Sequence, residues 1–182
     1  MGLQLPEIER LFRDHGHIAY GGEGVSQLEH SLQCAQLAEE NGAAETLVAA
    51  CFLHDLGHLL NPQGETPTAR GIDDQHQYFA IPFIRHLFPP AVVEPIRLHV
   101  DAKRALCALE PGYYEALSED SKRSLVLQGG IYPSAEADAF AAKPHARDAM
   151  QLRRWDDAAK VPGKPTPSLS RYLGIAARCT TQ

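Results

Sequence analysis

Two histidines and an aspartate interrupt an otherwise apolar stretch from Phe52 to Leu60, which has the sequence FLHDLGHLL. His54 and His58 are four residues apart, so on a helix they would share one face. Asp55 would be turned by about 100° from His54, close enough for both side chains to reach one metal cluster. An unpaired carboxylate buried there would cost several kcal/mol, whereas a metal cation would neutralise it. The stretch therefore predicts a metal site.

Three further histidines in predicted helices offer more ligands: His30, His76 and His99. Any one of them alone is more often a hydrogen-bonded residue than a ligand. The combination changes that balance, because imidazole with carboxylate is the ligand mixture of iron, manganese or zinc. Helical bundles build dinuclear carboxylate sites by taking single ligands from several helices. The pattern thus favours a metal site shared by several helices.

The elements that would position these residues are helices nearly throughout. We predict helices at residues 5–13, 25–42, 43–60, 72–88, 89–109, 118–128, 134–142, 146–160 and 168–178. A glycine-rich loop at 15–24 and a polar Pro/Gly loop at 61–71 separate some of them, the second of functional-loop length. No alternating strand pattern and no internal repeat is evident. The prediction is an all-α fold, a single irregular helical bundle over 1–182.

Charge and composition exclude several classes of partner. The chain has 182 residues and a net charge of -6, which argues against nucleic acid or an anionic membrane as the main partner, since both usually bind a basic face. No stretch approaches the ~18 apolar residues of a membrane span, and no signal peptide is evident. The four cysteines show no metal-binding spacing. We expect reduced thiols and a cytoplasmic location.

The pattern H…HD…D, formed by His30, His54, Asp55 and a late aspartate in LRRWDD, resembles the signature of HD-domain metalloproteins. Most of these are phosphohydrolases. This chain is more similar to a special branch, the PhnZ- and TmpB-like mixed-valent di-iron oxygenases that cleave phosphonates. The matching stretches lie between residues 20 and 157: YGGE, QLEHSLQCA, LHDLGH, LHVDAKR, LSEDSKRSLVLQGG and LRRWDD. The resemblance implies a helical domain of the HD type with a lid loop near 15–25.

The resemblance also implies two iron ions in the mixed-valent Fe(II)/Fe(III) state. One would be held by His30, His54, Asp55 and Asp156. The other would be held by His76 and His99, with Asp55 bridging the two. Asp156 is the residue that follows RW in the matched motif, and its neighbour Asp157 is expected to be solvated.

The remaining implied roles concern substrate. The phosphonate pocket would be lined by His58, Lys103, Ser121, Ser124, Gln128 and Arg153. Tyr20 and Glu23 would form a lid pair that plugs the open iron position in the resting state.

Spacing supports part of this assignment. Lys103 lies one helical turn after His99 on the same face, where a cation suits a dianionic ligand. Arg153 lies three before Asp156 and has a guanidinium able to bind phosphonate oxygens bidentately.

The implied reaction is oxidative cleavage of a C–P bond. The substrates would be O2 and a small organophosphonate of the 1-hydroxy-2-aminoethylphosphonate type, or its N-methylated form. The products would be phosphate and glycine or an N-methylated glycine. The protein would contribute positioning, charge neutralisation and redox tuning.

Two other functions compete with this one. An HD phosphohydrolase would use the same ligands on a nucleotide or another phosphomonoester, with Lys103 and Arg153 as a phosphate clamp. The YGGE loop argues against it, because hydrolysis does not require that loop. A non-catalytic, metal-stabilised module is disfavoured because the pocket carries more phosphate-type ligands than a structural site needs. The substituent on the substrate nitrogen, the metal and the oligomeric state stay open, and a monomer is compatible with the sequence.

Overall fold

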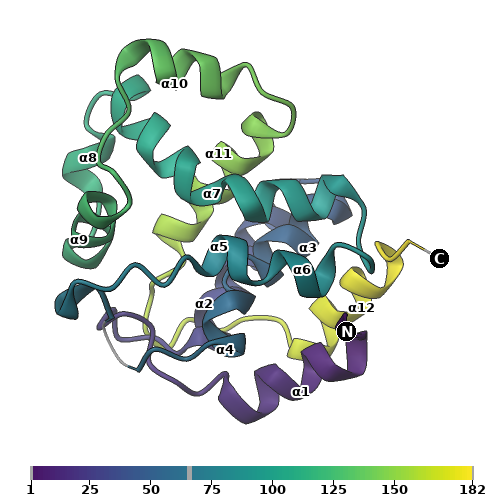
Figure 1. Ribbon diagram of the computed structural model, residues 1–182. Coiled ribbons are helices and arrows are strands. Elements are labelled where there is room, and N and C mark those ends of the chain that lie inside the picture. Colours follow the sequence, from purple (N-terminus) through teal and green to yellow (C-terminus); the bar gives the residue numbers. More distant parts are fainter. Residues whose placement is uncertain (1, 65–66, 182) are drawn as a thin grey trace.

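A computed structural model describes residues 2–64 and 67–181 (Figure 1). Across these residues the chain is helical and has no strand, only an isolated antiparallel bridge between Ala19 and Ser26. The all-α prediction is confirmed. In chain order the elements are α1 Leu5–His15, α2 Gln27–Glu40, α3 Glu45–Leu53, α4 Leu56–Leu60, the 3-10 turn η1 Pro67–Arg70, α5 His76–Phe79, α6 Ile81–Ile84, α7 Pro90–Leu109, α8 Tyr113–Ala116, α9 Glu119–Leu127, α10 Ser134–Ala141, α11 Ala146–Ala158 and α12 Leu169–Arg178.

Helix α7 is central, and α11 lies along it (Figure 1). Its first half, including Ile96, packs into the larger hydrophobic cluster with α1, α2, α3 and α12. Its second half, including Ala102, packs into a smaller cluster with α10 and α11. His99 and Lys103 are therefore buried where the two clusters meet, each with only 1% of its surface exposed. Polar groups at that depth need polar or metal partners.

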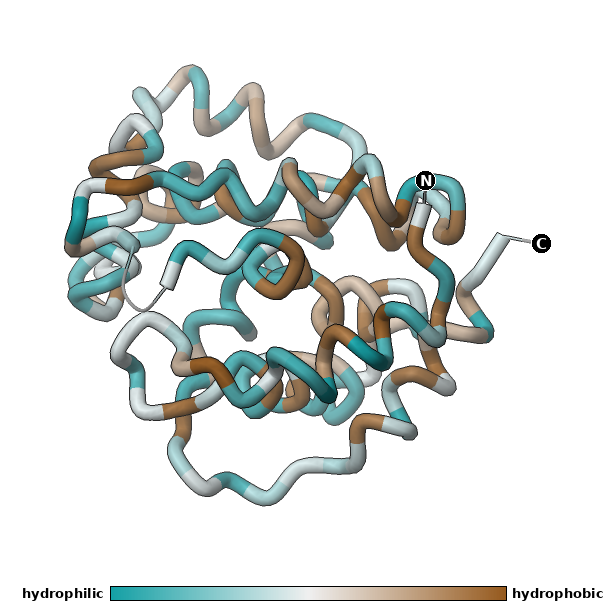
Figure 2. The backbone as a smooth tube through the Cα atoms, turned by 60° about the horizontal axis from the view of Figure 1, so that its bottom comes forward, coloured by the Kyte–Doolittle hydropathy of each residue, from teal (hydrophilic) through white to brown (hydrophobic). Residues whose placement is uncertain are grey.

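The larger cluster holds the chain segment that precedes the HD pair. The ring of Phe52 stacks on Phe12 of α1 with centroids 4.7 Å apart and lies 6.1 Å from the ring of Tyr172 of α12. Burying a residue such as Phe52 contributes about 1.5–3 kcal/mol. Apolar residues recur at helical spacing along the tube in Figure 2, which is the pattern that lets each helix bury one side.

The predicted helix over 43–60 is wrong in one respect, because it breaks into α3 and α4 at His54 and Asp55. Asp55 has φ -101° and ψ 14°, outside the helical region. A Cβ on Gly57 would overlap the backbone carbonyl of His76, so glycine lets α4 approach α5 this closely. As a result His54 and His58 do not share a helix face, and they reach Asp55 from different sides.

The predicted helix over 72–88 is also shorter than expected. Only α5 and α6 are helical there, and Pro82 lies in the first turn of α6. The backbone N–H of Gln75 donates to Asp73, and that of His76 donates to Asp74. Such side-chain acceptors compete with helical hydrogen bonds, so the helix begins only at His76. Helix α8 was not predicted, and the remaining predicted helices are present with ends shifted by a few residues.

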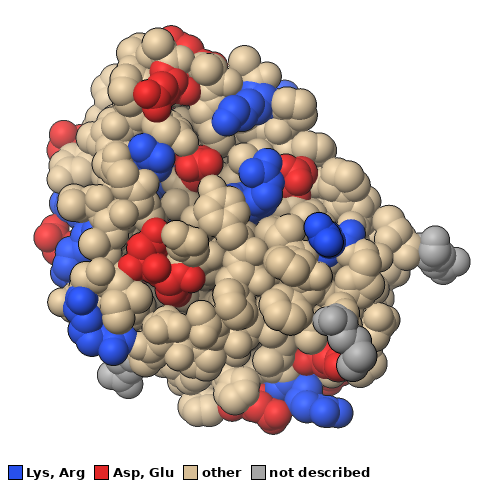
Figure 3. All heavy atoms as spheres, viewed as in Figure 1, with Lys and Arg blue, Asp and Glu red and all other residues tan. Residues whose placement is uncertain are grey.

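Charged groups of both signs are interspersed on the face shown in Figure 3. No described helix is both long and apolar enough to cross a membrane.

Candidate metal centre

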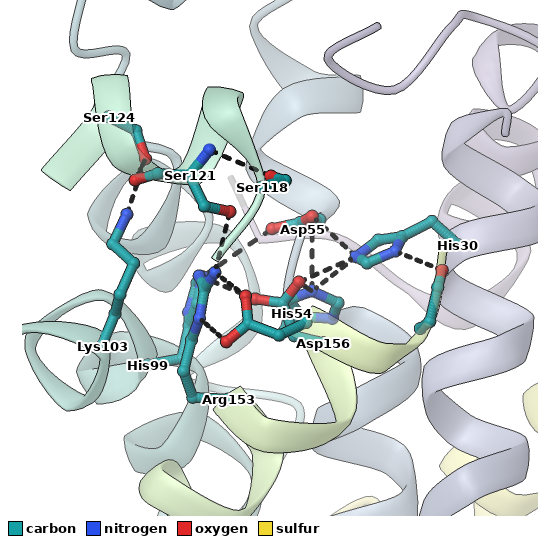
Figure 4. Close-up of polar contacts among 12 residues, drawn as sticks. His30, His54, Asp55, His99, Lys103, Ser118, Ser121, Ser124, Arg153 and Asp156 are labelled. Atoms are coloured by element: carbon teal, nitrogen blue, oxygen red, sulfur yellow. Dashed lines mark hydrogen bonds and ion pairs between the residues drawn. The ribbon is translucent and has the colours of Figure 1, made fainter. Parts of the chain in front are cut away.

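Three predicted ligands meet on one side of Asp55 (Figure 4). His30 comes from α2, His54 ends α3, and Asp156 comes from the last turns of α11. The Nε2 atom of His30 lies 3.2 Å from Nε2 of His54 and 3.2 Å from Oδ1 of Asp156. The Oδ2 atom of Asp55 completes the group, 3.4 Å from Nε2 of His30 and 3.3 Å from Nε2 of His54.

The other oxygen of Asp55 faces a second pair of histidines. Its Oδ1 lies 3.3 Å from Nε2 of His76 and 3.8 Å from Nε2 of His99. These two Nε2 atoms are 3.0 Å apart. The carboxylate therefore stands between two ligand groups with one oxygen directed to each. All six predicted ligands are brought together.

The outer ring nitrogens decide what these groups can bind. The Nδ1 atoms of His30, His54 and His99 lie 2.7–2.9 Å from the backbone carbonyls of Ala159, Cys51 and Ile96. A carbonyl only accepts, so each Nδ1 carries the proton and, in the neutral ring, each Nε2 presents a lone pair.

His76 is held in the same way by Asp74, whose Oδ1 is 2.9 Å from its Nδ1. Neither oxygen of Asp55 has a hydrogen-bond donor among residues 2–64 and 67–181. Lone pairs and carboxylate oxygens that converge without donors fit metal cations, and the outer anchors are typical of metal-bound histidine.

Electrostatics differ between the two groups. Burial alone would raise the pKa of Asp55, but the surrounding histidines, His54 first, hold it well below its usual range. Burial lowers the pKa values of His30 and His54, yet nearby carboxylates reverse this and raise both. Burial together with His76 and His54 keeps the pKa of His99 well below its usual range, so it stays neutral. A cation entering the first group would thus displace protons.

Two cationic side chains, Lys103 and Arg153, line the cavity beside the ligands and form its cationic wall. The Nζ atom of Lys103 donates to Oγ of Ser124 at 2.6 Å, and that hydroxyl donates to the backbone carbonyl of Ser121 at 3.0 Å. Burial, and after it the charge of Arg153, lower the pKa of Lys103 to about 7. An anion bound there would favour the protonated form of this lysine.

Both edges of the Arg153 guanidinium group already bind carboxylates. Its Nη1 lies 2.8 Å from Oδ2 of Asp156, and its Nε and Nη2 both bind Asp157. Asp157, expected to be solvated, instead anchors Arg153 and accepts from the hydroxyl of Tyr113. The expected bidentate grip of Arg153 on a phosphonate is therefore not available in this arrangement. Its charge still borders the cavity, and its Nη2 is 3.4 Å from Oγ of Ser121.

His58 stands at the second group, partly exposed. Its Nδ1 lies 2.6 Å from Oδ2 of Asp74, and its ring stacks on His76 with centroids 4.1 Å apart. Burial lowers its pKa, but Asp55 and Asp74 reverse this and raise it, which suits a donor to an anion. Asp74 thus orients two histidines at once. Sequence reasoning missed it, although the pair Asp73 and Asp74, separated from His76 by one residue, was the available signal.

A cavity of about 130 Å³ opens onto both ligand groups. Gln128, predicted for the pocket, lines it, and its Oε1 is buried without a partner. Gln27 at the start of α2 has the same features and was not predicted. Its position one turn before His30 was the available signal. Both amides offer polar contacts to a small bound molecule.

The lid residues separate in the structure. The ring of Tyr20 stacks on His30 with centroids 3.9 Å apart, and its hydroxyl lies 3.4 Å from Oδ1 of Asp156. Glu23 instead pairs with Lys160, with Oε1 3.3 Å from Nζ. Tyr20 covers the first ligand group, while Glu23 is turned to Lys160.

Comparison with known proteins shows the family to which the chain belongs. The model of the HD domain family matches residues 28–156. A hydroxymethylphosphonate dioxygenase of Gimesia maris is 41% identical over 179 residues, 98% of this chain and 89% of that protein. A [1-hydroxy-2-(trimethylamino)ethyl]phosphonate dioxygenase (glycine-betaine-forming) of Leisingera caerulea is 34% identical over 171 residues, 94% of this chain and 87% of that protein. An uncharacterized protein of Acanthamoeba polyphaga mimivirus is 33% identical over 170 residues, 92% of this chain and 78% of that protein.

Proposed function

The chain belongs to the HD-domain family, and we propose that it is a metal-dependent oxygenase that uses O2 to cleave the C–P bond of a small 1-hydroxyalkylphosphonate. The observation that carries the proposal is the carboxylate of Asp55, which directs one oxygen to each of two histidine groups beside a cationic wall. Both relatives with a named activity are dioxygenases of phosphonates that carry a hydroxyl group.

The residues present fit two metal ions, which we propose to be iron in the mixed-valent Fe(II)/Fe(III) state. His30, His54 and Asp156 would hold one, His76 and His99 the other, and Asp55 would bridge them. Such a pair supplies redox chemistry for O2 and Lewis-acid binding of substrate oxygens. Histidine and carboxylate ligands without thiolates suit iron.

The wall beside the metals would bind the phosphonate. Lys103 and the hydroxyl of Ser124 supply charge-assisted and neutral hydrogen bonds, and Ser121 lies one turn before Ser124. Arg153 would add charge while it holds Asp156 in place. His58, with Nδ1 held by Asp74, would donate from Nε2 at the opposite side. Together they orient the C–P bond toward the metals.

The lid would control access to the site. The ring of Tyr20 on His30 excludes water from the first ligand group, and a substrate that needs this position must displace it. Tyr20 is thus proposed as the resting-state plug. Glu23 would share that role only after leaving Lys160.

The proposed reaction balances without a further reductant. A 1-hydroxyalkylphosphonate and one O2 give a carboxylate, phosphate and a proton. The C–P bond and the C1–H bond break, one new bond to oxygen forms at carbon and one at phosphorus, and O2 is the oxidant. A 2-amino substrate would give glycine, an N-methylated one an N-methylated glycine, and hydroxymethylphosphonate would give formate.

We also propose that residues 1–182 form one HD-type domain. The family match begins at residue 28 and ends at 156. Outside it, Phe12 of α1 and Tyr172 of α12 are buried in the same core as Phe52. A phosphohydrolase is not favoured, because neither relative with a named activity is a hydrolase.

The test is turnover of iron-loaded protein with hydroxymethylphosphonate and 1-hydroxy-2-aminoethylphosphonate. We expect O2 consumption and phosphate release in equal amounts, and a mixed-valent EPR signal that changes on substrate addition. A panel of phosphomonoesters with Mn(II)-loaded protein is the counter-test. Phosphate release from that panel, with none from hydroxy-phosphonates, would replace the proposal by the hydrolase.

A further inference from the structure

Lys160, just after α11, is a nearly buried cation to which sequence reasoning assigned no role. Its side chain is 11% exposed, and its Nζ lies 3.3 Å from Oε1 of Glu23. The same Nζ donates to the hydroxyls of Ser118 at 3.3 Å and Ser121 at 3.2 Å. Lys160 therefore joins the lid loop to the start of α9, where Ser121 lines the cavity.

Its main electrostatic effect falls on the lid. Glu23 is the one acidic residue between residues 16 and 26, and its side chain is 17% exposed. Glu23 does not itself line the cavity, but Tyr20 and Gly21 of the same loop do, so an unpaired carboxylate at Glu23 would attract a cationic group on a substrate at that end. Lys160 already neutralises the charge of Glu23 from within the protein. It also places a positive charge next to the hydroxyl of Ser121.

Most of the carboxylates that line the cavity are engaged with partners of their own. Asp55 and Asp156 belong to the metal centre, and Asp74 binds His58 and His76. Asp120 accepts from the hydroxyl of Thr68 and pairs with Arg123.

Asp73 is the exception. It accepts from the backbone N–H of Gln75 and has no lysine or arginine partner among the described residues. Because Asp73 is half-buried and could itself attract a cationic group, an Asp73→Asn variant is included as a separate control.

Aromatic recognition of a cation is also poorly supported. Among the described residues that line the cavity, Tyr20 is the one Phe, Tyr or Trp, and its ring is stacked on His30. A quaternary ammonium group is usually held by a cage of several rings. Within the part of the chain that the structure describes, the buried cavity-lining side-chain atoms without a hydrogen-bond partner, Asp55 apart, are the amide oxygens of Gln27 and Gln128, which can accept from a hydroxyl without a counter-charge.

We propose that Lys160 is a specificity-determining residue, which neutralises Glu23 and so selects 1-hydroxyalkylphosphonates that carry no amino or ammonium group, hydroxymethylphosphonate among them. This inference rests on the proposed function and narrows its substrate class. Lys160 acts through Glu23 and Ser121, so it is a positioning residue. It leaves the wall around Lys103 to bind the phosphonate that all such substrates share.

The experiment compares two ligands, hydroxymethylphosphonate and 1-hydroxy-2-aminoethylphosphonate. Their Kd values are measured by calorimetry on anaerobic, iron-loaded protein, and their kcat/KM values by phosphate release in air. The variants are Lys160→Met, Lys160→Arg, and Lys160→Met combined with Glu23→Gln. Lys143→Met, at an exposed lysine just after the end of α10, is the matched control.

We expect wild type and Lys143→Met to bind hydroxymethylphosphonate at least about tenfold more tightly than the amine. Lys160→Met should reduce the ratio of the two Kd values, amine over hydroxymethylphosphonate, about fivefold or more, because Glu23 is then free to attract the ammonium group. Lys160→Arg should keep the wild-type ratio. The double variant should bind the amine no more tightly than wild type does, because the negative charge of Glu23 has been removed together with Lys160.

Equal or tighter binding of the amine by wild type would overturn the inference, as would a Lys160→Met ratio equal to that of Lys143→Met. If wild type prefers the amine and Asp73→Asn abolishes that preference, Asp73 and not Glu23 is the cation site. The Kd ratios decide the role of Lys160 even without turnover. Absence of phosphate release from both ligands would instead refute the proposed function.

Discussion

The metal centre has two halves with Asp55 between them: the first contains His30, His54 and Asp156, and the second contains His76 and His99. The two halves orient their histidines in different ways. His30 and His54 are fully buried, come from α2 and the end of α3, and are each oriented by a backbone carbonyl. His76 follows a loop and begins the short helix α5. It is oriented by the side chain of Asp74, which also holds the partly exposed His58.

The difference teaches where the site is fixed and where it can change. Backbone carbonyls inside the core can move only if the helices move, so the first half is as rigid as the fold. A side-chain acceptor on a loop can be replaced without disturbing a helix. His99 of the second half is anchored like the first half, by the backbone carbonyl of Ile96 in α7. We therefore expect the first half and His99 to be tied to stability, and the loop side of the second half, His76 with Asp74, to tolerate substitution with loss of function alone.

Asp55→Ala should have the largest effect, because this carboxylate faces both halves. We expect loss of both metals, and with them the stabilisation that metal binding gives the folded state. Metal content by mass spectrometry and Tm with and without added iron are the measurements. Asp14→Ala, at an exposed position on α1, is the control. Retention of a full complement of metal would remove Asp55 from the bridge.

A paired test separates the halves directly. His54→Ala should lose metal from the first half and destabilise the protein by about 3–5 kcal/mol, because it leaves Asp55 and Asp156 buried with one partner fewer. His76→Ala should lose metal from the second half alone, with a much smaller change in the free energy of unfolding. Equal losses of stability in the two variants would contradict the comparison.

Asp74→Asn tests the side-chain anchor of the second half. We expect metal affinity there to fall about 10–100-fold, since the amide no longer holds two imidazoles by charge. The first half should keep its affinity, which a two-site metal titration would resolve. A fall of equal size at both sites would show that the halves are not independent.

His58→Ala should keep both metals and weaken phosphonate binding about tenfold, or ~1.4 kcal/mol. The metal content of the same sample is its internal control. Loss of metal from this variant would instead show that His58 is a metal ligand and belongs to the second half.

The smallest effect concerns the pH dependence of binding through Lys103. Burial lowers its pKa to about 7, so above pH 7 the free protein holds it increasingly neutral, and an anionic ligand must then recruit a proton. Affinity for hydroxymethylphosphonate should fall several-fold between pH 7 and pH 8.5. Lys103→Arg, which stays charged, should show a flatter profile. Parallel profiles would exclude Lys103 as the titrating group.

Local information was enough for much of this protein. Helical periodicity predicted nearly every long helix, since burying one side of a helix depends on residues three and four apart. The chemical types in FLHDLGHLL, together with His30, His76 and His99, predicted a metal site that the structure assembles; Asp156 was added by the resemblance to HD-domain proteins. These inferences require only which residues are present and at what spacing.

Only the tertiary structure decided the rest. The break at Asp55 sends His54 and His58 to different sides of one carboxylate, and Gly57 lets α4 approach the backbone of His76. Asp157 binds Arg153, and Lys160 binds Glu23 from 137 residues away in the chain. Hydrogen bonds and ion pairs act over a few ångströms in space, whatever the separation in sequence. The sequence alone therefore determined which groups could do the chemistry, and the packing of α2, α3, α7 and α11 decided which of them meet.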